Sequence, residues 1–436
     1  MKKNDITQVV EQYLCHSCGS CDSVCNHNSI DFFRNSAGYI FPKINYETCT
    51  NCGLCYNVCP GISFKEDINF VDPFIGKVKD IFVAKANDEK IYKNSQSGGV
   101  ATMILKYLFD NNIIKAAVVT EMSLESSPYN KSKIIYSVEE LYNSQKSKYL
   151  PTSLNKLLSE VIKIDGKVAI VGLSCHFEGI EKFVKLSKRN HKLKDKIIKI
   201  GLICDRVLLE TSVDFFIDKV LKVENIKDFV FRDKINTPYP GDMTILTQDN
   251  KLYKLDKTDR ILMKSFFTPI RCKLCFDKMN IFSDLVIGDP HGIDSIDKNG
   301  ESLVLVRTNI GQDIVDNMKK VNLISSKHIS IEQAIKGQGI ENKKKSFSAY
   351  LKGWQVLGYV IPTYPNEILK NLPEVSNKEV KRAQKDLQLS LKLTKFNSKN
   401  SLLKYAYSYY IKNKSIYKVR NVLSKIKRKG LKCLSK

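Results

Sequence analysis

The chain has 436 residues, of which 43% are hydrophobic and 27% are charged. This length suffices for two or three domains, and this composition is ordinary for a globular protein. No stretch approaches the roughly 18 consecutive apolar residues that a membrane-spanning helix requires. The N-terminus has two lysines but lacks the apolar segment of a secretory signal, so we expect a cytoplasmic protein. Its 13 cysteines then indicate metal ligands or reactive thiols instead of a disulfide framework.

The first predicted unit is a cysteine repeat near the N-terminus. Two C-x2-C-x2-C-x3-C runs lie 34 residues apart, and a proline follows the second run. This pattern resembles bacterial two-cluster ferredoxins, in which the fourth thiolate of each run binds the other cluster. The resemblance implies one 4Fe–4S cluster on Cys15, Cys18, Cys21 and Cys59, and a second on Cys49, Cys52, Cys55 and Cys25. The alternatives are zinc ligands or free thiols.

After Pro60 the pattern changes to alternating apolar strands and amphipathic helices. The predicted strands are 80–86, 113–120, 167–172, 196–204, 228–233, 284–289 and 303–308, and the predicted helices are 98–111 and 174–186. Such alternation is typical of an α/β domain with a mainly parallel or mixed sheet. We therefore expect an α+β ferredoxin-like domain, an α/β mixed-sheet domain and a basic helical C-terminal tail.

Much of the net charge of +24 belongs to the C-terminal tail. Residues 387–436 contain 14 Lys and Arg and no Asp or Glu, which leaves 24 − 14 = +10 for the preceding residues. Residues 362–375 are predicted to form a linker before this tail. In 401–426, one helical face can carry Tyr405, Tyr409, Ile416, Val419, Leu423 and Ile426. Such a helix can contact an anionic membrane surface, an acidic partner or the protein itself. Because no nucleic-acid motif accompanies it, we expect no specific nucleic acid as a partner.

A serine- and glycine-rich stretch precedes the predicted helix 98–111. Ser95, Ser97, Gly98 and Gly99 allow close approach of a ligand, and free N–H groups at a helix start favour an anion. The alternative is a simple helix N-cap at Ser97.

The segments "SQSGGVAT", "KSKYLPTSL", "VGLSCHFEGI", "GLICD" and "RCKLCFDKMNIFSDLVIGDPHGI" together resemble the family of coenzyme F420 hydrogenase/dehydrogenase beta subunits over about residues 1–340. This resemblance implies an iron–sulfur flavoprotein that binds FAD. Ser97, Gly98 and Gly99 would meet the FAD phosphates, with Ser95 beside them, and Lys148 would lie near the flavin. Asp289, at a strand end, is expected either to contact the flavin or to cap the backbone. The resemblance leaves open whether F420 is the substrate.

Five cysteines remain outside the ferredoxin repeat. Cys175, Cys204, Cys272 and Cys275 lie in these family motifs at strand ends, and Cys433 lies in the tail. Because the ends of neighbouring parallel strands meet at one edge of a sheet, these four thiolates suit a third 4Fe–4S cluster near the flavin. The alternative is that Cys175 and Cys204 are ordinary core cysteines, with Cys272 and Cys275 a redox pair or half of a zinc site.

His176 and His291 are the histidines inside the family motifs. Either side chain can donate a proton in flavin or substrate chemistry, and the alternative for both is a packing role.

These motifs predict an oxidoreductase that passes electrons between a small two-electron substrate at FAD and one-electron clusters. A ferredoxin-like carrier or a partner redox subunit would accept or supply the electrons, and the resemblance also allows a link to surface-polysaccharide biosynthesis. The alternatives are an electron-transfer subunit without its own substrate site and an iron–sulfur redox sensor. The expected domains are 1–66, 75–160, 161–345 and 376–436. The tail fits a location at the inner face of the membrane.

Overall fold

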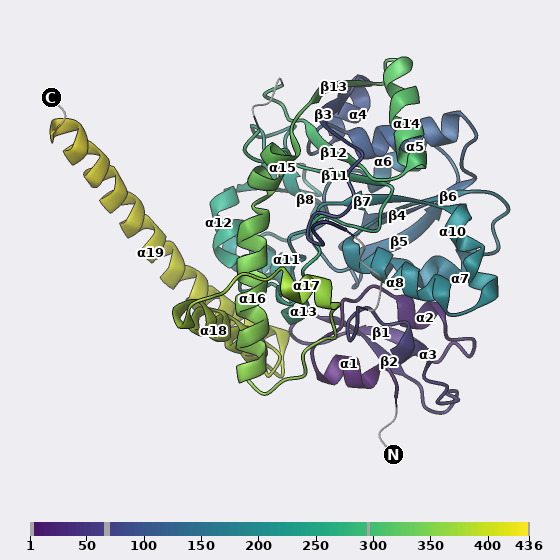
Figure 1. The fold of residues 1–436 in the computed structure, drawn as a ribbon. Helices are drawn as coiled ribbons and strands as arrows, with labels where there is room; N and C mark the ends of the chain where they lie inside the picture. Colours follow the sequence, from purple (N-terminus) through teal and green to yellow (C-terminus); the bar gives the residue numbers. More distant parts are fainter. Residues whose placement is uncertain (1–3, 65–69, 294–296, 435–436) are drawn as a thin grey trace.

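A computed structural model describes residues 4–64, 70–293 and 297–434, without the side chains of 188–189 and 420–434. A small N-terminal domain packs against one end of a larger sheet domain, and helices from the C-terminal part of the chain lie along both (Figure 1). The structure thus confirms a mixed α/β architecture with a helical C-terminal region.

In the small N-terminal domain, the backbone conformation repeats together with the cysteine pattern. Its elements are α1 (Thr7–Glu11), α2 (Ser20–Ser23), β1 (Ile30–Arg34), β2 (Ile40–Ile44) and α3 (Leu54–Asn57). Gly19 and Gly53 precede α2 and α3, and both have a left-handed backbone, with φ of +89° and +74°. Ser17 and Asn51 share a positive φ two residues earlier. The two cysteine runs therefore fold in the same way.

The larger domain is built on an eight-stranded sheet with the order β13-β3-β12-β11-β7-β6-β4-β5. The strands are β3 (Asp80–Ala86), β4 (Ala116–Met122), β5 (Asn130–Ile135), β6 (Val168–Gly172), β7 (Ile197–Leu202), β11 (Leu285–Gly288), β12 (Ser302–Val306) and β13 (Ile324–His328). The pairs β4–β6, β6–β7 and β7–β11 are parallel, whereas β12 pairs antiparallel with both β11 and β3. The strands β3, β11, β7, β6 and β4 therefore run in one direction and end at one edge.

Helices cover both faces of this sheet. They are α4 (Glu89–Asn94), α5 (Val100–Asp110), α6 (Leu141–Ser144), α7 (Leu158–Val161), α8 (Ser174–Lys185), α9 (Lys188–His191), α10 (Leu193–Lys196) and α14 (Asn309–Lys320), with the short helix η1 (Leu154–Leu157). Ala117 and Val119 of β4 pack in the same cluster as α5 and α14, whereas Ala116 and Val118 pack with α8. Burial on both faces explains why the central strands are continuous apolar runs.

The remaining elements lie beside the sheet. They are α11 (Thr211–Phe215), η2 (Phe216–Leu221), the strands β8 (Ile226–Asp233), β9 (Asp242–Thr247) and β10 (Leu252–Leu255), and the helices α12 (Lys257–Met263), α13 (Ile270–Lys273), α15 (Ile331–Gln338), α16 (Ile340–Val356) and α17 (Asn366–Lys370). The predicted strand 228–233 forms, but in a separate antiparallel sheet with β9 and β10. The predicted linker 362–375 instead contributes Tyr364 and Ile368 to the core. Their burial shows that this segment is packed.

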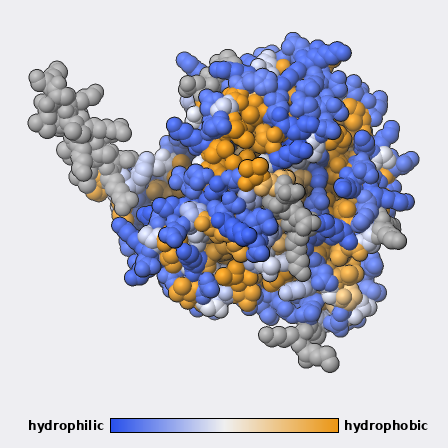
Figure 2. Space-filling view, viewed as in Figure 1, coloured by the Kyte–Doolittle hydropathy of each residue, from blue (hydrophilic) through white to orange (hydrophobic). Residues whose placement is uncertain are grey.

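The C-terminal tail forms α18 (Asn377–Leu393) and α19 (Lys399–Leu434). Leu402, Leu403 and Tyr410 are buried against the body, whereas Ile416 and Val419 are exposed on the part of α19 that projects away from it (Figure 1). The side chains of Leu423, Ile426 and Cys433 lie outside the described residues. The face of the molecule in Figure 2 is largely hydrophilic, with separate hydrophobic areas between. Among the described residues, no helix is long and apolar enough to span a membrane.

Candidate functional site

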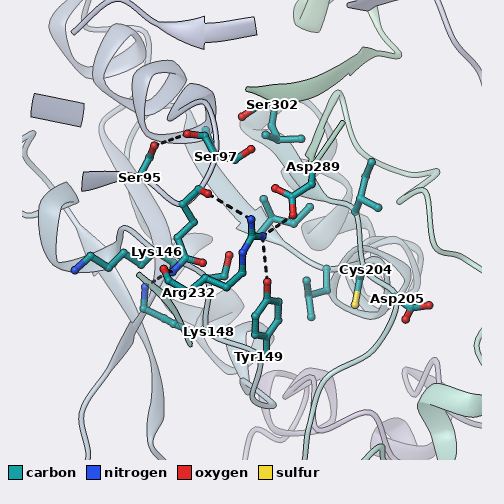
Figure 3. Close-up of a pocket in the computed structure, with 18 of the residues that line it drawn as sticks. Ser95, Ser97, Lys146, Lys148, Tyr149, Cys204, Asp205, Arg232, Asp289 and Ser302 are labelled. Carbon is teal, nitrogen blue, oxygen red and sulfur yellow. Dashed lines mark hydrogen bonds and ion pairs between the residues drawn. The ribbon is translucent and has the colours of Figure 1, made fainter. Parts of the chain in front are cut away.

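A cavity of about 780 Å³ opens at the edge where the parallel strands end. Its lining comes from the start of α5, the segment after α6, the segments after β6, β7 and β11, and from β8 and α12 (Figure 3). This edge is where α/β sheets commonly bind ligands, and the volume falls within the roughly 300–1,000 Å³ of small-molecule and cofactor sites. The cavity is the candidate site.

The structure brings most of the predicted cofactor and proton-transfer residues to this cavity. Ser95, Ser97, Gly99, Lys148, His176, Asp289 and His291 all line it. Gly98 is not among the lining residues. A Cβ atom on Gly98 would lie 2.3 Å from the carbonyl oxygen of Ala84 and 2.6 Å from the amide nitrogen of Ser302. This glycine therefore permits close backbone packing against β3 and β12.

The turn before α5 and the first residues of α5 line the cavity. Gly99 is the N-cap residue of α5, has a φ of +75° and lines the cavity. Ser97 does not cap the helix as the simple alternative supposed, because its hydroxyl donates to the carbonyl of Glu301. The first amides of α5 thus lack a side-chain cap, and the residues that carry them line a cavity in which an anion would satisfy such amides.

Lys148 is a half-buried cation that holds the segment after α6 through hydrogen bonds. Its Nζ donates to the carbonyls of Ser144 at 2.7 Å, Gln145 at 2.6 Å and Lys146 at 3.0 Å. Burial lowers the pKa of Lys148 to about 7. The side chain therefore holds the cavity wall from Ser144 to Lys148 and contributes a charge that responds to neutral pH.

Arg232, which sequence patterns did not single out, contacts residues from several walls of the cavity. It lies at the end of β8, is 6% exposed, and forms an ion pair with Asp289. It also donates to the carbonyl of Pro240 at 2.9 Å and to the Tyr149 hydroxyl at 3.4 Å (Figure 3). The sequence feature that could have pointed to Arg232 is its position as a basic residue at the end of an apolar strand.

The cavity is strongly basic. Basic lining residues include Lys146, Lys148, Arg206, Arg232, Arg260 and Lys264, and the acidic residues of the described lining are Asp205 and Asp289. Two buried lining atoms, Gln96 Oε1 and Arg260 Nε, have no hydrogen-bond partner within the described chain. Unpaired buried polar groups are rare in proteins, and a ligand in the cavity would satisfy these two atoms. An anionic, hydrogen-bonding dinucleotide such as FAD fits this lining.

A second, smaller cavity of about 30 Å³ adjoins the first. Cys175, Cys204, Cys272 and Cys275 all line it, and Cys204 lines both cavities. Burial raises the pKa of the Cys204 thiol well above its ordinary value, and the neighbouring Cys272 and Cys275 raise it further. Four of the five cysteines outside the repeat therefore come together beside the large cavity.

His16 and His176 lie near these four cysteines. His16 lines the small cavity, and its buried Nε2 has no partner within the described chain. His176 Nδ1 accepts the Leu173 N–H at 3.1 Å, so Nε2 carries the hydrogen that is donated to the Thr152 carbonyl at 2.9 Å. Burial lowers the pKa of His176 to about 4. Both ring nitrogens are engaged, which favours the packing role over proton donation, whereas the exposed His291 remains open for it.

The first ferredoxin set has the surroundings of thiolate ligands. The backbone N–H groups of Ser17 and Gly61 donate to the Sγ atoms of Cys15 and Cys59, each at 3.3 Å. Burial raises the pKa of the Cys21 thiol, and the neighbouring Cys15, Cys18 and Cys59 raise it further. These contacts bring together the four residues assigned to one cluster.

The second ferredoxin set lies farther out. Cys52 is exposed, and Cys25, Cys49 and Cys55 are half-buried. Ser29 N–H donates to Cys25 Sγ at 3.3 Å.

The first set, by contrast, faces the larger domain. Asn155 N–H donates to the Cys18 carbonyl at 2.8 Å. Burial raises the pKa of the Cys175 thiol, and the nearby Cys18 raises it further. The cysteine sets thus form a series from the large cavity to the surface.

The ligands of a 4Fe–4S cluster must surround a group that is wider than a single metal ion. Among residues 4–64, 70–293 and 297–434, no three or more His, Cys, Asp or Glu side chains converge as the ligands of a single metal ion. The assignment of the cysteine sets therefore depends on the small cavity, the N–H···S contacts and the repeat. Four thiolates around one cavity suit a 4Fe–4S cluster.

Comparisons with known proteins match the same segments. The model of a 4Fe-4S dicluster domain matches residues 14–61. Models of the coenzyme F420 hydrogenase/dehydrogenase beta subunit match residues 81–159 with its N-terminal part and 165–332 with its C-terminal part.

Several characterised proteins are similar along much of the chain. One subunit of the F(420)H(2) dehydrogenase of Methanosarcina mazei is 24% identical over 350 residues, which cover 78% of this chain and 92% of that protein. The coenzyme F420-dependent sulfite reductase of Methanocaldococcus jannaschii is 26% identical over 73% of this chain, but the match spans only 48% of that enzyme. A chain in the F420-reducing NiFe hydrogenase complex of Methanosarcina barkeri aligns at 18% identity and a TM-score of 0.49, covering 64% of this chain and 96% of that one. The matched domain models confirm the resemblance, and the chain belongs to the family of coenzyme F420 hydrogenase/dehydrogenase beta subunits, with a 4Fe-4S dicluster domain at its N-terminus.

Proposed function

We propose that this iron–sulfur oxidoreductase binds FAD in the large cavity and three 4Fe–4S clusters on its cysteine sets. The observation that carries the proposal is Cys204, which lines both the large basic cavity and the small four-cysteine cavity. When bound, FAD exchanges two electrons with an organic substrate and single electrons with clusters. In this proposal a flavin in the large cavity would lie beside its first electron acceptor in the small cavity.

The protein residues hold and orient the cofactor in this proposal. The amides that follow Gly99 and the basic lining attract the two phosphates. Arg232 and Asp289 keep the strand ends together, and Lys148 keeps the wall after α6 in place. His291, exposed at the mouth, is the proposed proton donor to the substrate. Ser95 supports the turn through its bond to the Ser97 carbonyl at 2.7 Å.

The outer cysteine set faces the expected electron partner. Because Cys52 is exposed, a ferredoxin-like carrier or a partner redox subunit can approach the second ferredoxin cluster directly. The relative in Methanosarcina mazei is one subunit of a dehydrogenase, which supports such an assembly. The predicted contact of α19 with an anionic membrane, the cytoplasmic location and the link to surface-polysaccharide biosynthesis stay predictions from the sequence.

Anaerobic reconstitution of the full chain tests this proposal. We expect about 12 Fe and one FAD per chain, because each of three clusters holds about four iron atoms. Iron and acid-labile sulfide are measured chemically, and the flavin is measured by its absorbance after release. About 8 Fe without flavin would contradict the flavoenzyme and favour an electron carrier or a sensor. Reduction of an artificial acceptor by the isolated chain then separates the enzyme from a carrier subunit.

FAD affinity should fall as the pH rises from 6 to 8. Burial lowers the pKa of Lys148 to about 7 in the free protein, and the anionic phosphates favour its charged form. Below pH 7 the charge is already present, whereas above pH 7 binding must take up a proton. The affinity then decreases by up to about tenfold per pH unit. Quenching of flavin fluorescence measures it.

Two variants serve as controls for this pH dependence. Lys148→Met should bind weakly at pH 6 and show a flat profile. Lys146→Met removes another lining charge and should weaken binding while it keeps the slope. Lys234, whose pKa burial lowers to about 8, contacts the same loop, so the Lys148→Met profile is flat up to about pH 7 and falls above it only through Lys234. Equal slopes in the wild type and in Lys148→Met would refute the assignment to Lys148.

A further inference from the structure

Arg271 is a buried cation at the junction of the two iron–sulfur regions. It is 2% exposed and directly precedes Cys272 on α13. Its Nε donates to the Gly61 carbonyl at 3.0 Å, and its Nη2 donates to the Pro60 carbonyl at 3.4 Å, just after Cys59 in the chain. One guanidinium therefore contacts the backbone beside a ligand of each of two neighbouring cysteine sets.

The hydrogen-bond partners of Arg271 are all neutral. Its Nη1 donates to the carbonyl of Leu274 and to the Tyr364 hydroxyl, the latter at 3.1 Å, and the guanidinium lies 5.8 Å from the Tyr364 ring centre. Among the described residues, no carboxylate pairs with Arg271, although Glu178 acts on it at longer range. A desolvated cation without a nearby anion is strongly unfavourable. Within the described chain, Arg271 thus has no carboxylate in direct contact, and Glu178 offsets its charge only from a distance.

The cysteines on either side can supply negative charge close to Arg271. Arg271 directly precedes Cys272, its Nη1 donates to the Leu274 carbonyl just before Cys275, and its Nη2 donates to the Pro60 carbonyl just after Cys59. A 4Fe–4S cluster with four thiolate ligands is an anion, and reduction adds one further negative charge. Nearby charge is one of the factors that set a cluster potential, and it acts strongly in a dry interior.

We propose that Arg271 is the shared counter-cation of the cluster on Cys175, Cys204, Cys272 and Cys275 and of the cluster on Cys15, Cys18, Cys21 and Cys59, and that it raises the reduction potentials of both. This inference rests on the three clusters of the proposed function. The positive charge of Arg271 stabilises the reduced form of each inner cluster, which is a supporting role and not a catalytic one. The hydrogen bonds of Arg271 within the described chain do not reach the outer set, Cys25, Cys49, Cys52 and Cys55, so the outer cluster keeps its own potential.

Redox titration of the reconstituted full chain, monitored by electron paramagnetic resonance, tests this role. In Arg271→Gln, we expect two titration steps to move to more negative potentials while the third stays in place. Each tenfold fall in the ratio of reduced to oxidised cluster corresponds to a shift of about 59 mV. Arg271→Lys retains the charge and should retain the potentials. The step absent from Cys272→Ala identifies the cluster beside the large cavity.

Lys273→Gln combined with Asp386→Asn is the matched control, with its first change on the same helix. Lys273 is also buried, but it pairs with Asp386 at 2.7 Å, so removal of both charges keeps the net charge and should leave all three potentials in place. If Arg271→Gln loses iron, retention of iron by Arg271→Lys supports the need for charge, whereas loss from both variants reduces Arg271 to a packing residue and overturns the inference. A wild-type protein with fewer than three steps contradicts the proposed function itself. Three steps that do not move in Arg271→Gln overturn only the role of Arg271.

Discussion

Replacing Cys272 by alanine should remove about 4 of about 12 iron atoms and break the electron path at its first step. Cys272 lines the small cavity together with Cys175, Cys204 and Cys275. Burial raises the pKa of Cys204, and the neighbouring Cys272 raises it further. Loss of one of four ligands opens the cluster to solvent and disassembly. Bound FAD, once reduced by light, should then no longer reduce the ferredoxin clusters.

The measurement combines iron and sulfide content with paramagnetic resonance after photoreduction. Cys433→Ala is the control, because this cysteine lies outside all of the motifs, and it should keep the full iron content. The ferredoxin signals of Cys272→Ala should still appear with dithionite, which reaches the exposed outer set directly. An unchanged iron content would contradict the third cluster and favour the alternative that Cys272 and Cys275 form a redox dithiol.

Replacing Arg232 by methionine should lower the free energy of unfolding by about 3 kcal/mol and abolish FAD binding at micromolar flavin. Arg232 is 6% exposed and Asp289 is only 19% exposed at its side chain, so the variant leaves a largely buried carboxylate without its cation. It also removes the donors to Pro240 and Tyr149, which lie in different walls of the cavity. Urea unfolding and flavin binding measure the two effects.

A double-mutant cycle separates these two effects. Arg232→Met combined with Asp289→Asn removes both charges and should recover part of the lost stability, because no buried carboxylate remains unpaired. FAD binding should remain weak in the double variant, since the positive charge and the junction between the walls are still missing. Full recovery of FAD binding would show that Arg232 serves only to neutralise Asp289.

The sequence predicted the elements that have strong local signals. The predicted strand 80–86 forms as β3 at those residues, and the helix predicted from Ser174 begins there as α8. The edge strands β5 and β13 escaped prediction, because β13 exposes four of its five residues and so lacks an apolar pattern. The linker prediction for 362–375 was wrong because its Tyr364 and Ile368 pack in the core of the molecule, a long-range contact that local composition cannot reveal.

For the site, residue spacing alone specified the types of ligand: a repeat that folds twice in the same way, four further cysteines, and a turn before α5. These features are set within a few residues of chain. Folding of the whole chain was needed to bring Cys175 and Cys204 to the same cavity as Cys272 and Cys275, and to reveal Arg232, Arg260 and Arg271. These residues come from segments far apart in the chain. The role of each charged side chain depends on its burial and on its contact partners. The order of the strands in the sheet decides both, whereas residue spacing does not.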